Sequence, residues 1–296
     1  MLERIRIVLI GTSHPGNIGA TARAMHNMGL ADLALVAPRS ESRSAEAISR
    51  ASGADRILHH APVYDDLETA VSDCRLVVGA SARSRTLPWP MLTPRALAER
   101  LPAELAAPEA RVALVFGRED TGLTNAELQR CHAHVHIPTN PDYSSLNLAA
   151  AVQVLTYECR LAWLAFTDAS HAAPEDATAA ETDHASDAER GADADADNKN
   201  VAEAQQVVPS VEHETVFGIA WDHPPASHAD LERYFEHLER TLITLKFHDP
   251  EKPRQLMARL RRLYMRARPD QMEINILRGI LSATEKQVAK RDSGES

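Results

Sequence analysis

Cysteine is scarce in this chain of 296 residues, which holds only three, at positions 74, 131 and 159. None belongs to a Cys-x-x-Cys pair, so the sequence gives no sign of a zinc site or of thiol exchange. Three cysteines, odd in number, fit a reducing compartment. We therefore expect a cytoplasmic protein.

Long apolar runs are absent as well, because no stretch approaches the roughly 18 residues that a membrane span needs. The chain begins with Met-Leu-Glu-Arg and continues directly into a strand-like segment, without the apolar region of an export signal. We expect a soluble protein that neither spans a membrane nor is exported.

Acidic residues outnumber basic ones, 42 to 32, but the excess is local, since residues 168–203 hold 11 of the acids and 2 of the bases. This stretch is rich in alanine and aspartate and too poor in large apolar side chains to offset the entropy of ordering. We interpret residues 167–225 as a disordered linker; an acidic segment that mimics nucleic acid or binds a basic partner is the alternative. The linker separates an N-terminal domain, residues 1–166, from a C-terminal domain, residues 226–296.

The N-terminal domain alternates short β-rich apolar runs with segments of helical periodicity. The runs are 5–10, 33–36, 76–78, 112–116 and 135–137, with a weaker one at 57–59. Such alternation is typical of parallel strands joined by crossover helices. We predict an α/β fold with six parallel strands.

Residues 146–166 form a long segment, rich in alanine and leucine, that is apolar on nearly all sides. A helix of this kind is usually buried on more than one face. The sequence leaves open whether it packs within one subunit or at a dimer interface.

The C-terminal domain is predicted to be helical, because apolar residues recur at helical spacing in 229–245, 253–267 and 275–288. Seven basic side chains and no acid lie between residues 252 and 268: Lys252, Arg254, Arg259, Arg261, Arg262, Arg266 and Arg268. They predict a cationic face that contacts phosphates, with a merely solvated face as the alternative. We expect Tyr264 in the core, with a stacking surface as its alternative.

A glycine-rich turn from Gly11 to Gly19 follows the first strand and opens a helix, a geometry that brings backbone N–H groups to an anion. It is not a P-loop, since Asn17-Ile18 stands where Lys-Ser/Thr would hold phosphate and magnesium. It is not a dinucleotide fingerprint, since Ala37-Pro38-Arg39 offers no acid after the second strand. Loops at 79–85, 116–123 and 138–147 also follow strands, and we expect them to converge on one pocket.

Three ordered stretches resemble the motifs of the SPOUT methyltransferases: Asn17-Ile-Gly-Ala-Thr-Ala-Arg23, Gly117-Arg-Glu119 with Gly122-Leu123, and Pro141-Asp-Tyr-Ser-Ser-Leu-Asn147. Ser-Ala-Arg-Ser-Arg-Thr-Leu-Pro-Trp-Pro, at residues 81–90, is similar to a stretch of the TrmJ group within that family. Arg-Arg-Leu-Tyr-Met-Arg-Ala-Arg-Pro and Asn-Ile-Leu-Arg-Gly-Ile-Leu in the C-terminal domain resemble the same group.

The resemblance implies a C-terminal trefoil knot in the parallel sheet, an obligate homodimer, and S-adenosylmethionine bound at the knot. Spacing alone would not propose a knot, because knots are rare. The cofactor-binding positions that it implies are Ala80, Ser81, Ala82, Gly117, Ile137, Ser144, Ser145 and Leu146. Small side chains there permit the close approach of backbone to a ligand.

The implied reaction is methyl transfer to the ribose 2′-hydroxyl of cytidine or uridine at position 32 of the tRNA anticodon loop. Arg23 corresponds to the family's catalytic arginine. Because a guanidinium stays protonated, we expect Arg23 to hold a phosphate and to lower the pKa of the hydroxyl, with proton abstraction as the alternative. Ser145 is expected to contact the ribose and, with Asn17, Glu119 and Asn147, to orient the reacting groups; each could instead be a cap or turn residue.

Arginines next to the cofactor loop and in the C-terminal domain are the predicted tRNA contacts: Arg83, Arg85, Arg259, Arg262 and Arg266. His132, His134 and His136 would share one face of a strand, but no acid or cysteine completes a metal site, and methyl transfer requires no metal.

Two features depart from the family pattern: the linker is long and acidic, and Asp120 places negative charge near the expected RNA entrance. Two other functions remain open. One is 2′-O-methylation of ribosomal RNA or of another tRNA position. The other is a non-catalytic RNA-binding or chaperone protein with the same fold.

Overall fold

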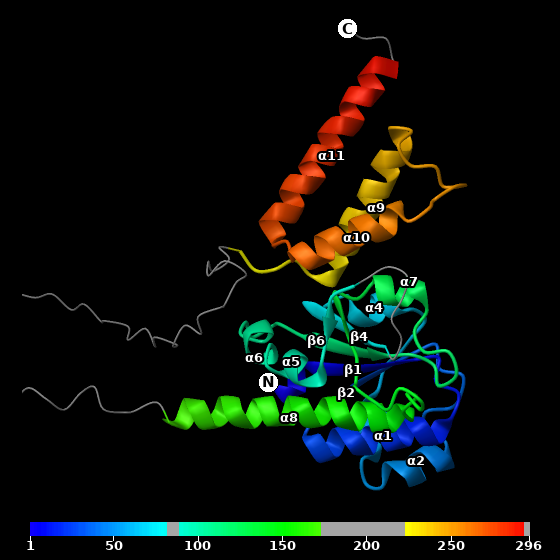
Figure 1. The fold of residues 1–296 in the computed structure, drawn as a ribbon, viewed down its shortest axis with the longest axis vertical. Helices are drawn as coiled ribbons and strands as arrows, with labels where there is room; N and C mark the ends of the chain where they lie inside the picture. The colour runs from blue at the N-terminus through cyan, green and yellow to red at the C-terminus, as the bar shows by residue number, and fades with distance from the viewer. Residues whose placement is uncertain (82–88, 173–222, 293–296) are drawn as a thin grey trace, which may run out of the picture.

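The computed structural model describes residues 1–81, 89–172 and 223–292, which form a seven-stranded parallel sheet with helices on both faces and a helical C-terminal domain (Figure 1). The strands are β1 (Ile5–Ile10), β2 (Asp32–Val36), β3 (Val63–Tyr64), β4 (Leu76–Ala80), β5 (Met91–Leu92), β6 (Val112–Phe116) and β7 (Ala133–Val135). Their order is β3-β2-β1-β6-β4-β7-β5, and every pairing is parallel. The predicted parallel sheet and helical C-terminal domain are confirmed; the knot stays a prediction.

Three details of the strand prediction were wrong. Residues 57–59 lie in helix α3 (Asp55–His60), where Ile57 and Leu58 are buried against the core. β7 begins at Ala133 and ends before residue 136, because Ala133 and His134 pair with β4 although their side chains give no apolar signal. The two-residue strands β3 and β5 are too short to show a period of two.

Two helical layers cover the sheet. One contains α1 (Pro15–Met28) and α8 (Leu148–Ala172), which pack side by side, with the shorter helices α2 (Ala45–Ala51), α3, α5 (Pro94–Ala98) and α6 (Leu101–Glu104) around them. On the other face lie α4 (Leu67–Val71) and α7 (Asn125–Gln129). A single 3₁₀ turn (Leu2–Arg4) precedes β1.

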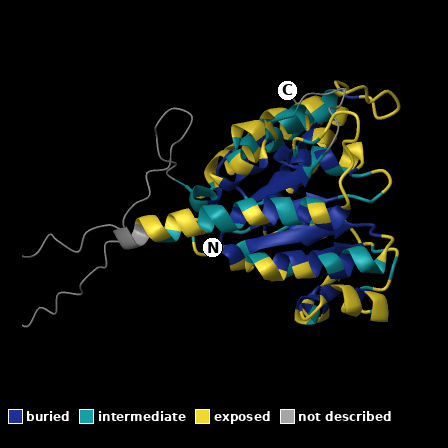
Figure 2. Cartoon of the chain, turned by 60° about the horizontal axis from the view of Figure 1, so that its bottom comes forward, coloured by how far each residue is buried: buried dark blue, intermediate teal, exposed yellow. Residues whose placement is uncertain are grey.

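The strands are buried on both faces, which explains why they read as continuous apolar runs. Within β1, Ile7 and Leu9 pack under the α1 and α8 layer, whereas Val8 and Ile10 pack under the α4 layer. Figure 2 shows the sheet as the buried centre between the two layers. Each such side chain contributes about 1.5–3 kcal/mol to stability.

Helix α8 buries one side, which includes Leu148, Val152 and Leu155, and exposes apolar side chains that include Tyr157, Leu164 and Phe166. The described residues do not cover these exposed side chains, so burial of α8 on more than one face stays a prediction. None of the helices in the described residues is both long and apolar enough to cross a bilayer.

The C-terminal domain consists of α9 (His228–Thr244), α10 (Leu256–Ala267) and α11 (Gln271–Asp292). Its core contains Tyr234, Phe235 and Met265, and Tyr264 packs edge-on against Tyr234 at 4.9 Å between ring centroids. The expectation that Tyr264 belongs to the core is therefore confirmed. Residues 173–222, most of the predicted linker, lie outside the described residues, and the domain boundaries stay predictions.

The C-terminal domain docks on the α4 side of the sheet through the start of α9. The backbone N–H groups of His228 and Ala229 donate to the carbonyl oxygens of Cys74 and Ser72, at 3.1 and 3.3 Å. These contacts satisfy groups that a helix end otherwise leaves unpaired. Arg268 adds an ion pair with Glu104 at 2.5 Å. The two domains thus share polar contacts.

Candidate functional site

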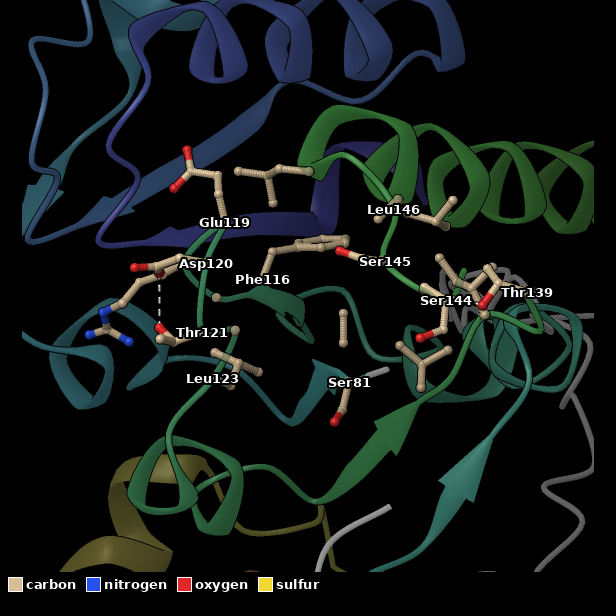
Figure 3. A pocket seen from close by; sticks show the side chains of 18 residues that line it. Ser81, Phe116, Glu119, Asp120, Thr121, Leu123, Thr139, Ser144, Ser145 and Leu146 are labelled. Carbon is tan, nitrogen blue, oxygen red and sulfur yellow. Dashed lines mark hydrogen bonds between the residues drawn. The ribbon is translucent and has the colours of Figure 1, made fainter. Parts of the chain in front are cut away.

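Loops that follow β4, β6 and β7 surround one cavity of about 200 Å³ at the carboxyl edge of the sheet (Figure 3). All predicted cofactor-binding residues within the described part of the chain line it: Ala80, Ser81, Gly117, Ile137, Ser144, Ser145 and Leu146. Ala82 lies outside the described residues. The expected convergence of the three loops on one pocket is what the structure shows.

The cavity has an apolar wall and a polar side. Phe116, Leu123 and Leu148 supply apolar lining, and Glu119 and Asp120 add two carboxylates. In Figure 3 the two carboxylates lie on the side of the cavity away from Ser144 and Thr139. A ligand that combines a flat apolar group with positive charge suits such a lining. Phe116 and Leu123 belong to the 116–123 segment that was expected at the pocket, although neither was named as a cofactor-binding residue. Leu148 was not predicted, because a buried helix residue gives no signal beyond apolarity.

The loop after β6 is a tight hairpin. Arg118 and Gly122 exchange backbone hydrogen bonds of 3.2 and 2.9 Å across it. Gly117 lies so close to the returning strand that a Cβ atom would be 2.1 Å from the carbonyl carbon of Gly122. The Arg118 side chain forms a bidentate pair with Glu127, at 3.0 and 3.1 Å, which fixes the hairpin to the start of α7. The motif glycine is thus required by backbone packing.

A chain of hydrogen bonds joins three predicted catalytic residues. The amide of Asn147 donates to the Asn17 Oδ1 at 3.1 Å, and the Asn17 Nδ2 donates to the Glu119 Oε1 at 3.0 Å. Asn147 also accepts from the N–H of Ala149 at 3.0 Å, so it caps the first turn of α8 at the same time. Both readings of Asn147, as cap and as site residue, are therefore compatible.

Glu119 accepts more hydrogen bonds than Asn17 alone provides. The backbone N–H groups of Ser13 and His14 and the Ser13 hydroxyl point at its carboxylate, at 3.1 to 3.3 Å. Partial burial by itself would raise the pKa of Glu119, but these donors favour the charged form and lower the pKa to about 2. Glu119 is consequently ionised at neutral pH and holds the turn before α1. Sequence reasoning did not name Ser13 and His14.

We expect Glu119 to make stability pH-dependent in acid. Its pKa is lower in the folded chain than the ordinary 4.5, so its contribution is present above about pH 4.5 and is lost as the pH falls toward 2. Glu119→Gln should cost about 1 kcal/mol at neutral pH, since water screens the partly exposed carboxylate, and should flatten this acid dependence. Thermal unfolding between pH 7 and 2.5 measures it. Glu99→Gln, at an exposed carboxylate directly after α5, is the control, and equal acid profiles for the two variants would contradict the assignment.

Arg23 and Ser145 are placed differently from the hydrogen-bonded chain. Ser145 lines the cavity and is exposed. Arg23 is exposed on α1, six residues or about 9 Å along the helix from Asn17, and is not among the cavity-lining residues. Within the described residues, therefore, Asn17, Glu119 and Asn147 orient one another, and no hydrogen bond or ion pair fixes the Arg23 side chain.

The histidines of the β7 region have structural partners. The His132 Nδ1 accepts from the N–H of Val77 at 3.0 Å, and burial keeps the pKa of His132 well below its ordinary value. His134 and His136 contact the carbonyl oxygens of Leu128 and Ser81, at 3.0 and 3.2 Å. Each ring is thus engaged with the backbone.

The predicted RNA-contacting arginines divide into three groups. Arg83 and Arg85 lie outside the described residues. Arg259 and Arg266 are exposed on α10, and Arg262 is half-buried there. The cationic face is narrower than predicted, because Arg261 points inward. It forms a bidentate ion pair with the buried Glu232, at 2.5 and 2.7 Å, and its guanidinium lies 4.5 Å from the centre of the Phe235 ring.

Comparison with known proteins agrees with this geometry. Residues 4–157 match the SpoU rRNA Methylase family, and residues 229–293 match the C-terminal domain of the tRNA methyltransferase TrmJ. A curated relative from Pseudomonas aeruginosa, "tRNA (cytidine/uridine/adenosine-2'-O-)-methyltransferase TrmJ", is 50% identical over 97% of this chain and 95% of its own length. The Escherichia coli K12 "tRNA (cytidine/uridine-2'-O-)-methyltransferase TrmJ" is 46% identical over 97% of both chains.

Solved structures show the same similarity. The crystal structure of TrmJ from Z. mobilis ZM4 covers 95% of this chain and 98% of its own, with a TM-score of 0.69 and 29% identity. A probable methylase family protein from Haemophilus influenzae covers 98% and 99%, with a TM-score of 0.54 and 38% identity. With a matching family model over more than half its length and full-length relatives near 50% identity, the chain belongs to the SpoU methylase family and, within it, to the TrmJ group.

Proposed function

We propose that this chain methylates the ribose 2′-hydroxyl of the cytidine or uridine at position 32 of the tRNA anticodon loop. The hydrogen-bonded chain of Glu119, Asn17 and Asn147 beside the cavity carries the proposal, because it joins three separate motifs at one point. The names of the relatives support tRNA and 2′-O-methylation, and the Pseudomonas relative's name adds adenosine to the nucleotides worth testing. We place the activity in the cytoplasm.

The cofactor is S-adenosylmethionine, which supplies an electrophilic methyl group when bound. The residues present fit it: Phe116, Val135 and Ile137 offer apolar surface to an adenine, and the carboxylates of Glu119 and Asp120 face the positive charge of such a ligand. Asp120 is thus assigned to cofactor rather than to RNA, which accounts for an acid at this position. No metal ligand is needed for this chemistry.

The ribose is held by Ser145, whose hydroxyl lines the cavity and hydrogen-bonds the sugar. Asn17 and Asn147 stabilise the wall against which the ribose lies, since their mutual bond fixes the starts of α1 and α8 together. Alignment of the attacking oxygen is the larger part of such a reaction, because orientation removes most of its entropic cost. Arg23 holds the adjacent phosphate and stabilises the oxygen as its proton passes to solvent water and the methyl group leaves the sulfur for that oxygen.

A homodimer completes the enzyme in this proposal. The support is the exposed apolar surface of α8, with Tyr157, Leu164 and Phe166, which a second copy would cover. Arg23 is exposed on α1, the helix that packs beside α8.

The C-terminal domain contributes phosphate contacts through α10. We expect the double variant Arg259→Gln with Arg266→Gln to lower kcat/KM for tRNA about tenfold, because each removes one exposed charge near the phosphate backbone. The logarithmic salt dependence of tRNA binding should flatten by about 2, one for each lost contact. Filter binding at several salt concentrations measures both effects. Arg56→Gln on α3 is the control, and an unchanged salt slope in the double variant would remove α10 from the RNA site.

The activity itself is tested with radiolabelled S-adenosylmethionine and unmodified tRNA transcripts, followed by nuclease digestion and mass spectrometry of nucleosides. A transcript with 2′-deoxyribose only at position 32 is the matched control, since it lacks the acceptor oxygen alone. We expect 2′-O-methylcytidine or 2′-O-methyluridine in the first transcript and no product in the control. Label in the deoxy transcript, on a base, or on ribosomal RNA alone would overturn the position, and no label on any RNA would favour a binding protein.

A further inference from the structure

The side of β7 that faces away from the cavity carries two histidines that no catalytic role uses. Val135 and Ile137 line the cavity, whereas His134 and His136 between and beside them do not. This alternation is the period of two expected of a strand. The partners of the two histidines show what the outward side of β7 holds.

His136 holds the end of β4. The Ser81 N–H donates to the carbonyl oxygen of Val135 at 3.0 Å, and the Ser81 carbonyl oxygen contacts the His136 Nδ1 at 3.2 Å. Both polar groups of the Ser81 backbone are therefore bound by consecutive residues of β7 and its extension. Because Ala80 and Ser81 line the cavity, the orientation of this peptide sets the shape of one cavity wall.

His134 holds the two residues that precede β5, Trp89 and Pro90. The Trp89 ring stacks on the His134 ring, with centroids 5.6 Å apart and planes 7° from parallel. The Trp89 Nε1 donates to the Cys131 carbonyl oxygen at 2.8 Å, and the His134 N–H donates to the Pro90 carbonyl oxygen at 2.8 Å. Ser81 and Trp89 are thus both held by histidines on the outward side of β7 and its extension.

We propose that His136 is a positioning residue for S-adenosylmethionine: by donating its Nδ1–H to the Ser81 carbonyl, it fixes the cavity wall formed by Ala80 and Ser81. His134 in turn holds Trp89 and Pro90, which precede β5. The proposal rests on the cavity being the cofactor site. His136 acts through Ser81 without touching the ligand, so its loss weakens cofactor binding and leaves the catalytic groups in place.

The test is the dissociation constant of S-adenosylmethionine, measured by calorimetry on the full chain. His136→Ala should weaken binding about three- to tenfold, the effect of one hydrogen bond that orders a binding wall. His136→Asn, whose Nδ2 occupies nearly the place of the histidine Nδ1, should restore binding to within about twofold of wild type. His59→Ala, an exposed histidine on α3, is the control.

If His136 only stabilised the fold, His136→Ala would lower the ligand-free Tm. The positioning role instead predicts that His136→Ala keeps the ligand-free Tm of wild type and, at saturating cofactor, its kcat, so that only the KM for S-adenosylmethionine rises. An unchanged dissociation constant in His136→Ala, a lowered Tm, or equal losses in the alanine and asparagine variants would overturn the proposal. If wild type itself bound no S-adenosylmethionine, the cofactor site would be wrong and the positioning role would fall with it.

Discussion

Arg23→Ala should reduce methyl transfer to tRNA by at least about a hundredfold, while the fold and the affinity for S-adenosylmethionine remain unchanged. The guanidinium is exposed on α1, and within the described residues no hydrogen bond or ion pair occupies it, so its removal disturbs no packing. Loss of one preorganised donor to developing negative charge typically costs a factor of about 10² to 10³ in kcat. Single-turnover methylation at saturating cofactor measures the chemical step directly.

Two further variants separate the possible roles of Arg23. Arg23→Lys keeps the charge but loses the planar fork, so partial activity in this variant supports electrostatic contact with a phosphate. His26→Ala, at an exposed position one turn farther along α1, is the matched control and should retain activity. A base that abstracts the proton would instead give Arg23→Lys a pH–rate profile shifted toward the lysine pKa. Full activity in Arg23→Ala would exclude both roles.

Gly117→Ala should abolish detectable binding of S-adenosylmethionine and destabilise the chain by roughly 2–3 kcal/mol, the cost of forcing atoms into a closely packed interior. Its Cβ would lie 2.1 Å from the carbonyl carbon of Gly122 and 2.2 Å from the backbone nitrogen of Leu123, and neither backbone atom can rotate away. The hairpin after β6 must open, and one wall of the cavity moves with it. Calorimetric titration with the cofactor and denaturant unfolding measure the two effects.

Gly122→Ala is the matched control for this change. Gly122 lies on the same hairpin with φ +69°, but a Cβ there meets no atom within 4 Å. Its cost is therefore the intrinsic one of a left-handed alanine, about 1–2 kcal/mol, without displacement of the cavity wall. If the two variants lost cofactor affinity equally, backbone conformation rather than close packing would explain the role of Gly117.

Much of the fold could be predicted from short-range patterns. The apolar runs of β1, β2, β4 and β6 are buried on both faces, so they stand out as continuous strands. Residues 57–59 misled the prediction because a buried helical turn and a short strand look alike at that length. β3 and β5 pair only two residues each, and such strands are specified by their neighbours across the sheet.

The candidate site could be predicted only in part from the residues themselves. The position of three loops after strands indicated a pocket, but the bond between Asn147 and Asn17 joins residues 130 positions apart, and no spacing rule reports such a contact. The resemblance to a known family identified those residues; physical chemistry then explains them. The sequence also assigned Arg261 to the cationic face, because a run of basic residues does not reveal that one of them pairs with a buried glutamate.

Asn147 gives the site a mechanical dependence on the longest helix of the N-terminal domain. Its side chain caps the first turn of α8 and reaches α1 in the same geometry, so the beginning of α8 and the Glu119 hydrogen-bond chain share one side chain. A slide of α8 by a single residue, about 1.5 Å along its axis, would stretch the 3.1 Å bond to Asn17 beyond hydrogen-bonding distance. A partner that binds the exposed side of α8 and shifts the helix would therefore change the geometry of the site. By reciprocity, a ligand that orders the site would change the affinity of α8 for that partner.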